Sequence, residues 1–164
     1  MRRVGIAVVS SCALAVSGCA QSVPDDTDAS VPEGDQIVAL AVDHRAQWRE
    51  LRIEGTTDLS DGAVVSYRVT HALATGLPPS EWPAQNLIAD GTAVVQEGQY
   101  WARLNTTYWP PGTVHVEVQF PVAPQPDGVR TRYGDFGEHL TGDNVTSLGA
   151  SKVVTVEHTL EWTR

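Results

Sequence analysis

The sequence predicts an all-β fold, an antiparallel β-sandwich of about seven strands, and three observations support this. Apolar and polar residues alternate with a period of two, as where Val114, Val116 and Val118 are separated by His115 and Glu117. Residues that favour turns separate these alternating segments, and the 3.6-residue period of amphipathic helices is almost absent. Such alternation is typical of antiparallel sheets that have one buried face and one solvent face.

Each expected strand rests on its own alternation. The first is an apolar run whose larger residues, Val38, Leu40 and Val42, share one parity, and the fourth is a short β-branched stretch. The other five place aliphatic or aromatic residues at every second position over most of their length. In chain order, the seven expected strands cover residues 37–42, 51–54, 65–70, 92–95, 100–104, 114–120 and 154–162.

The connections between these strands contain residues that favour turns. Glu97-Gly98 and Asp90-Gly91 are expected turns, and the cluster 57–62 ends in a glycine that tolerates positive φ. Two connections are long. Residues 72–91 leave room for a short extra strand near 86–89, and 121–150 for a short helix around 129–140.

The N-terminus predicts export and a lipid anchor. Arg2 and Arg3 precede an apolar run, residues 4–16, which is shorter than the ~20 residues of a membrane span and fits a signal peptide. The following Val-Ser-Gly-Cys, residues 16–19, resembles the lipobox of bacterial lipoproteins position by position. In that family the peptide before the cysteine is removed and its thiol receives a diacylglycerol. The alternative is an ordinary cleaved secretory signal with a chance cysteine.

This resemblance divides the chain into three parts. Residues 1–18 are the expected lipoprotein signal peptide, 19–35 the lipidated Cys19 with an acidic disordered linker, and 36–164 the sandwich domain. The linker has two prolines and no aromatic residue, and we expect it to remain disordered. Its aspartates lack calcium-loop spacing. Only Cys12 and Cys19 are cysteines, so the mature domain would contain no disulfide.

Charge and anchor together predict the partners. The formal net charge of −9 disfavours binding to nucleic acid, because phosphate backbones repel an acidic protein. The lipid at Cys19 implies attachment to the cell membrane or the outer membrane, with the domain facing the periplasm or the cell exterior. An envelope protein or a glycan is then the expected partner.

The domain itself resembles immunoglobulin-like or fibronectin-type sandwiches in its number of short strands. Residues 55–63, Gly-Thr-Thr-Asp-Leu-Ser-Asp-Gly-Ala, and the later Trp-Pro-Pro-Gly-Thr-Val at 109–114 are similar to uncharacterised bacterial envelope lipoproteins of that kind. The Cys-Trp-Cys core of antibody domains is missing. The resemblance implies a fold and a location in the cell envelope, but it does not imply a molecular activity.

Catalytic motifs are not found in the sequence. It contains no Gly-x-Ser-x-Gly, Ser-x-x-Lys or His-Glu-x-x-His, so we expect neither an enzyme nor a cofactor. The five histidines lack the spacing of a zinc helix or knuckle. His71 and His158 fall on the apolar parity of their strands, and two alternatives stand for them: they meet across a sheet and bind a metal, or they are satisfied residues of the core or its rim.

Aromatic residues are the candidate ligand-binding groups. Trp82, Tyr108 and Trp109 lie in expected loops, and Trp101 falls on the parity opposite Tyr100. Exposed aromatic rings stack on sugar rings or anchor protein partners. The alternative is that the loop tryptophans fold back onto the ends of the sandwich, while Trp48 and Trp162 close the edges of its core.

These observations predict a lipid-anchored, exported binding or structural module without catalytic machinery. Recognition would occur through the loops near Trp82 and Trp109. The alternative function is a carbohydrate-binding module for cell-wall or extracellular glycan, which uses exposed tryptophans.

Overall fold

The computed structural model describes residues 34–121 and 124–163, and Cys19 with the expected signal peptide lies outside them. The described chain forms two antiparallel sheets and one short parallel pair of strands. The elements in order are β1 Gln36–Ile37, β2 Asp43–Gln47, β3 Glu50–Thr56, β4 Val64–His71, α1 Ala72–Gly76, the 3₁₀ turn η1 Pro79–Glu81, β5 Ile88–Val94, β6 Gln99–Asn105, β7 Gly112–Phe120, α2 Asp127–Tyr133, β8 Leu140–Thr141, β9 Val145–Leu148 and β10 Ser151–Trp162.

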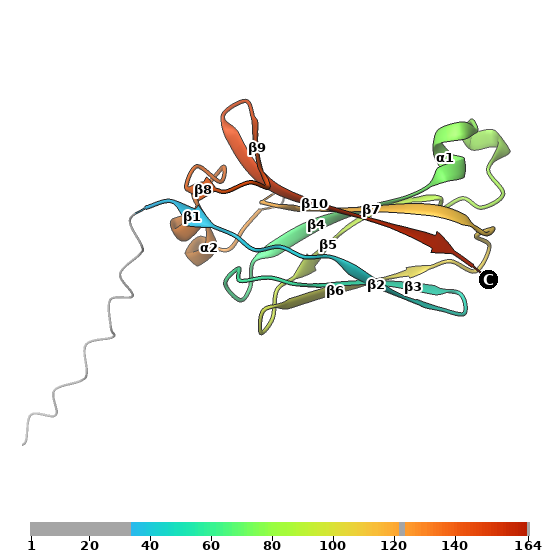
Figure 1. The fold of residues 1–164 in the computed structure, drawn as a ribbon, viewed down its shortest axis with the longest axis horizontal. Helices are drawn as coiled ribbons and strands as arrows, with labels where there is room; N and C mark the ends of the chain where they lie inside the picture. The colour runs from blue at the N-terminus through green and yellow to red at the C-terminus, as the bar shows by residue number, and fades with distance from the viewer. Residues whose placement is uncertain (1–33, 122–123, 164) are drawn as a thin grey trace, which may run out of the picture. The chain divides into compact units, whose positions relative to one another are not determined.

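The two antiparallel sheets form the layers of a β-sandwich (Figure 1). The larger has the strand order β5-β4-β7-β10-β9, and the smaller has β2-β3-β6. The parallel pair β1-β8 lies beside α2, at the end of the sandwich opposite α1 (Figure 1). The predicted all-β antiparallel sandwich is therefore confirmed.

Alternating side chains build the core between the layers. Along β6, Tyr100, Ala102 and Leu104 are buried while the four residues between and beside them are exposed. β7 buries Val114, Val116, Val118 and Phe120 in the same way. One continuous apolar cluster takes residues from both sheets. Because the core is continuous, the sandwich is one domain, and its two sheets have to pack together.

The number of strands exceeds the prediction of about seven, since the described residues contain ten. The expected strand at 37–42 is wrong as a single element: β1 ends at Ile37, and β2 begins only at Asp43. Val38 and Leu40 are nevertheless buried, as their shared parity predicts. β2 and the short β8 and β9 were missed because they are edge or two-residue strands, which bury few side chains and leave no period-two pattern.

The Asp90-Gly91 turn is also wrong, because both residues lie inside β5, where Asp90 pairs with Arg68 and Gly91 with Tyr67. A Cβ atom at position 91 would lie 2.4 Å from the Tyr67 hydroxyl oxygen, so the glycine makes room for that ring. β5 runs from Ile88 to Val94 as one strand, so the extra strand allowed near 86–89 is wrong as a separate element: residues 88 and 89 extend the strand expected at 92–95.

Other local predictions are confirmed. Glu97 and Gly98 have φ angles of 51° and 70°, and they form the tight turn by which the chain passes from β5 in one sheet to β6 in the other, closed by an isolated antiparallel bridge between Gln96 and Gln99. Two positive φ angles match the twist of a hairpin. The helix expected around 129–140 exists as α2, which begins two residues earlier and ends at Tyr133.

In residues 34–121 and 124–163, no helix combines the length and apolar character that crossing a membrane requires.

Candidate functional site

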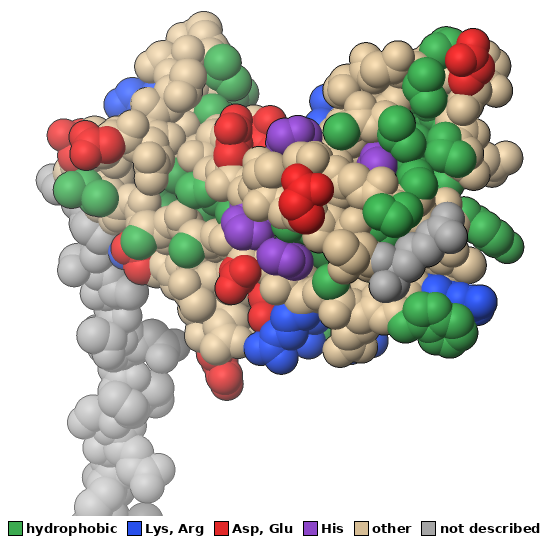
Figure 2. All heavy atoms as spheres, turned by 45° about the vertical axis from the view of Figure 1, so that its right-hand side comes forward, with side chains coloured by type: hydrophobic (Ala, Val, Ile, Leu, Met, Phe, Trp, Pro, Cys, Tyr) green, Lys and Arg blue, Asp and Glu red, His purple; other side chains and the backbone are tan. Residues whose placement is uncertain are grey.

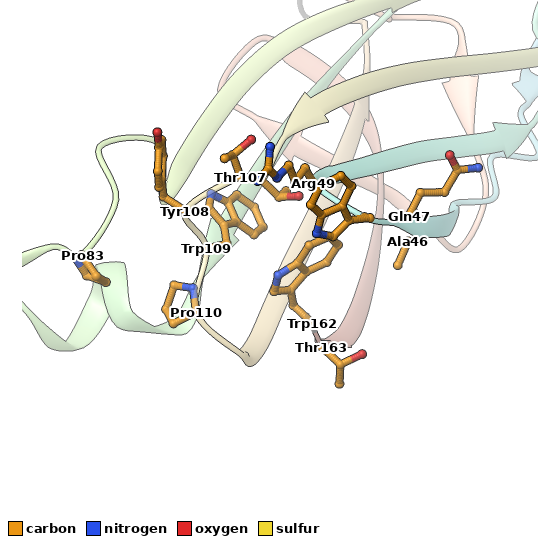
Figure 3. A pocket seen from close by; sticks show the side chains of 12 residues that line it. Ala46, Gln47, Arg49, Pro83, Thr107, Tyr108, Trp109, Pro110, Trp162 and Thr163 are labelled. Atoms are coloured by element: carbon orange, nitrogen blue, oxygen red, sulfur yellow. The ribbon is translucent and has the colours of Figure 1, made fainter.

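An aromatic pocket opens at the end of the sandwich where the β2–β3 turn, the β6–β7 loop and the last residues of β10 meet (Figure 3). We call this hollow of about 760 Å³ the aromatic pocket. Its lining comprises Ala46, Gln47, Trp48, Arg49, Pro83, Thr106, Thr107, Tyr108, Trp109, Pro110, Trp162 and Thr163.

Two buried indoles form the floor of the aromatic pocket. The Trp109 side chain is only 1% exposed, and its ring meets that of Trp162 edge to face, with the centroids 5.9 Å apart. The indole Nε1 of Trp109 donates to the Asn86 carbonyl oxygen and to Asn86 Oδ1, at 3.2 and 3.1 Å. Of the two alternatives for Trp109, exposure is therefore wrong and folding back is confirmed, since its ring caps the end of the core.

Two exposed rings flank this floor. Trp48 is 79% exposed in the turn between β2 and β3, and Tyr108 is 76% exposed in the β6–β7 loop. The expectation that Trp48 closes a core edge is wrong, whereas Trp162 does so. The guanidinium carbon of Arg49 lies 4.0 Å from the centre of the Trp48 ring, a cation–π contact between two exposed side chains.

The rim carries backbone strain. Arg49 has a φ of 66°, which is uncommon for a residue with a long side chain and places it in the left-handed region. Its carbonyl oxygen accepts a hydrogen bond of 2.9 Å from the Thr106 amide, which ties the β2–β3 turn to the neighbouring loop. Strain of this kind is stored preferentially at binding sites.

Two buried polar atoms on the lining residues lack a partner. Within the described part of the chain, Thr106 Oγ1 and Trp162 Nε1 are buried without a hydrogen bond. An unsatisfied buried donor costs about 1–3 kcal/mol. A ligand hydroxyl that reached either atom would recover part of that cost.

Trp82 and Trp101 lie outside the aromatic pocket. The half-buried Trp82 packs against the core and donates from Nε1 to the Leu77 carbonyl oxygen at 2.9 Å, so it folds back as the alternative interpretation held. Trp101 is 52% exposed on β6, where the guanidinium groups of Arg52 and Arg103 lie 5.0 and 5.2 Å from its ring centre. Of the four predicted aromatic residues, only Tyr108 and Trp109 share this site.

Of the two alternatives for His71 and His158, the one in which they meet across a sheet and bind a metal is wrong. His71 is fully buried at the end of β4: its Nδ1 accepts from the Leu73 amide, and Nε2 lies 3.1 Å from the Pro110 carbonyl oxygen. Its ring meets Trp109 edge to face. Both nitrogens are thus engaged, and His71 is a satisfied core residue. His158 instead lies beside His44 of β2.

Comparison of the chain with protein-family models, with curated proteins and with solved structures finds no match. The resemblances to bacterial lipoproteins and to immunoglobulin-like domains therefore stay predictions. What the domain does has to be inferred from its own geometry.

Proposed function

We propose that this chain is an exported, lipid-anchored binding module whose sandwich domain recognises its ligand at the aromatic pocket and performs no catalysis. The lipobox at Cys19 supports the anchor, and the acidic composition supports a domain that does not lie on anionic lipid. The sequence lacks the common nucleophile and metallohydrolase motifs.

The observation that carries this proposal is the exposure of Trp48 and Tyr108 beside a buried aromatic floor. Exposed apolar side chains that gather at one place mark an interaction site, whereas single ones are common on protein surfaces. Here they frame a hollow large enough for a small ligand, since pockets that bind such molecules range from roughly 300 to 1,000 Å³.

We propose sugar rings of a cell-wall or extracellular glycan as the ligand. A pyranose presents an apolar C–H face, which stacks on an indole or phenol ring, and hydroxyl groups at its edge. Thr106 Oγ1 and Trp162 Nε1 belong to lining residues and, within the described part of the chain, lack a partner, but both atoms are buried, so a sugar hydroxyl reaches them only if the lining shifts. The net negative charge of the whole chain favours a neutral glycan over a polyanionic one, although the only charged residue among the described residues of the lining is Arg49.

Calorimetric titration tests ligand binding directly. The full chain in detergent is titrated with soluble oligosaccharides from digested bacterial cell walls. We expect Trp48→Ala and Tyr108→Ala each to weaken binding about tenfold, because each removes an exposed stacking ring. Trp101→Ala is the matched control, since it removes an exposed ring elsewhere. Binding that is unchanged in both pocket variants, or lost only in Trp101→Ala, contradicts the proposal.

The anchor has its own test. Mass spectrometry of the processed protein is expected to find a diacylglycerol on Cys19, and Cys19→Ser is expected to release the protein from the membrane fraction. An unmodified Cys19 thiol at the mature terminus would exclude the lipid anchor and leave the pocket proposal standing.

A further inference from the structure

A pair of histidines joins the edges of the two sheets, away from the aromatic pocket. His44 lies on β2, the outermost strand of the smaller sheet, and His158 lies on β10 of the larger sheet. In the described part of the chain β9 pairs with β10 only over Ser151–Val154, so the segment containing His158 has β7 on one side and no strand on the other. The open edges of the two layers therefore adjoin here.

The two imidazoles face each other through nitrogen atoms. His44 Nδ1 lies 2.8 Å from His158 Nε2, and the ring planes are tilted by 40°. Both side chains are half-buried. As a hydrogen bond, this contact uses one N–H and one lone pair. When both nitrogens are deprotonated, each has a lone pair free for a metal ion, and the two atoms are close enough to bind the same one.

Asp43 supplies a third ligand atom. Its Oδ1 lies 3.7 Å from His44 Nδ1 and accepts a 2.7 Å hydrogen bond from the His44 amide, which orients the carboxylate. The three ligand atoms all lie within 4.8 Å of one another. Tetrahedral zinc with Zn–N bonds of about 2.05 Å separates its ligand atoms by about 3.3 Å. The distances of 2.8 and 3.7 Å from His44 bracket this value, and the third separation, between Asp43 and His158, is at most 4.8 Å, so ligation needs shifts of up to about 1.5 Å.

We propose that Asp43, His44 and His158 bind a divalent transition-metal cation of the zinc class. Two imidazole nitrogens and one carboxylate oxygen suit Zn²⁺ and Cu²⁺, whereas Ca²⁺ and Mg²⁺ prefer oxygen ligands alone. The arginines nearest in the adjoining hollow, Arg45 and Arg52, both pair with Glu54, at 2.5 and 3.0 Å, so neither neutralises Asp43.

A three-residue ligand set leaves a coordination position open. Asp43 and His158 both line a hollow of about 600 Å³, so a water molecule or a ligand group in that hollow can complete the tetrahedron. Figure 2 shows histidine side chains (purple) grouped with acidic ones (red) on this face of the molecule. The bound cation would also cross-link β2 to β10 and so hold the two layers together.

Calorimetry with zinc chloride tests the site. The full chain in detergent is expected to bind one Zn²⁺, and His44→Ala and His158→Ala are each expected to weaken this binding by about tenfold or more. His139→Ala is the control, since that exposed histidine contacts the Arg132 carbonyl oxygen instead. The proposal is overturned if the intact chain shows no saturable binding or if both variants bind as tightly as it does.

A measurement on the unsubstituted protein covers the case in which a variant fails to fold. Zinc is expected to shift the imidazole C–H resonances of His44 and His158 while leaving those of His71 and His139 in place, and calcium at the same concentration is expected to shift none. Shifts confined to other histidines, or equal responses to zinc and calcium, would refute a site built from these residues.

Discussion

The stabilities of the variants Trp109→Ala and Trp48→Ala distinguish the buried floor of the aromatic pocket from its exposed rim. Trp109 is buried, fills the end of the core and contacts both His71 and Trp162 edge to face. Truncating a buried tryptophan costs about 3–5 kcal/mol. Trp48 is 79% exposed, so its truncation is expected to change the free energy of unfolding by less than about 0.5 kcal/mol.

Guanidinium denaturation followed by far-ultraviolet circular dichroism measures both values. A typical domain is stable by only about 5–15 kcal/mol, so Trp109→Ala should lower the unfolding midpoint markedly. Trp101→Ala controls for the loss of an exposed indole elsewhere on the sandwich. A loss below about 1 kcal/mol for Trp109→Ala, or equal losses for Trp109→Ala and Trp48→Ala, would refute the assignment of Trp109 to the core.

Three further predictions concern the sandwich itself. Gly91→Ala is expected to destabilise it by more than about 1 kcal/mol, because the new Cβ would lie 2.4 Å from the Tyr67 hydroxyl oxygen, and thermal unfolding measures this. Gly128→Ala in α2, where nothing lies within 4 Å, is expected to stabilise by about 0.5 kcal/mol in the same assay, and a loss would be inconsistent with that open space. Burial raises the pKa of Tyr100 above its ordinary value of 10.0, so the folded state keeps this proton to a higher pH than the unfolded state. The contribution of the neutral Tyr100 to the free energy of unfolding is then fully present below about pH 10 and is lost as the pH rises further. Tyr100→Phe should remove this loss of stability at alkaline pH. If the variant loses stability with pH as steeply as the original chain, Tyr100 is not the cause.

Strands with one buried face could be predicted from sequence because each side chain's environment is set by its parity. β6 and β7 show this, since their alternating residues are buried and exposed in turn. β2 consists of Asp-His-Arg-Ala-Gln and buries none of these side chains fully, so it left no such pattern. Asp90-Gly91 is a dipeptide that favours turns, but here both residues pair with β4 in the middle of a strand. The glycine is needed there because a Cβ atom would collide with the Tyr67 ring.

The candidate sites were harder to predict because tertiary packing decides them. Sequence alone could not distinguish an exposed loop tryptophan from one that folds back: Trp109 folds back, as one alternative held, whereas Trp48, expected at an edge of the core, is exposed. His44 and His158 are 114 residues apart and meet only because the edges of two sheets adjoin. No local spacing could have found that pair, whereas the parity of His71 and its place at a strand end did predict a satisfied residue as one alternative.

Nuclear magnetic resonance of the indole N–H groups tests ligand entry at the aromatic pocket most directly. The chain has five tryptophans, and therefore five such signals in a ¹⁵N-labelled sample. On addition of cell-wall oligosaccharide, the Trp48 signal is expected to move while the Trp101 signal stays in place. Movement of Trp101 alone, or binding that moves neither signal, would contradict the proposed site.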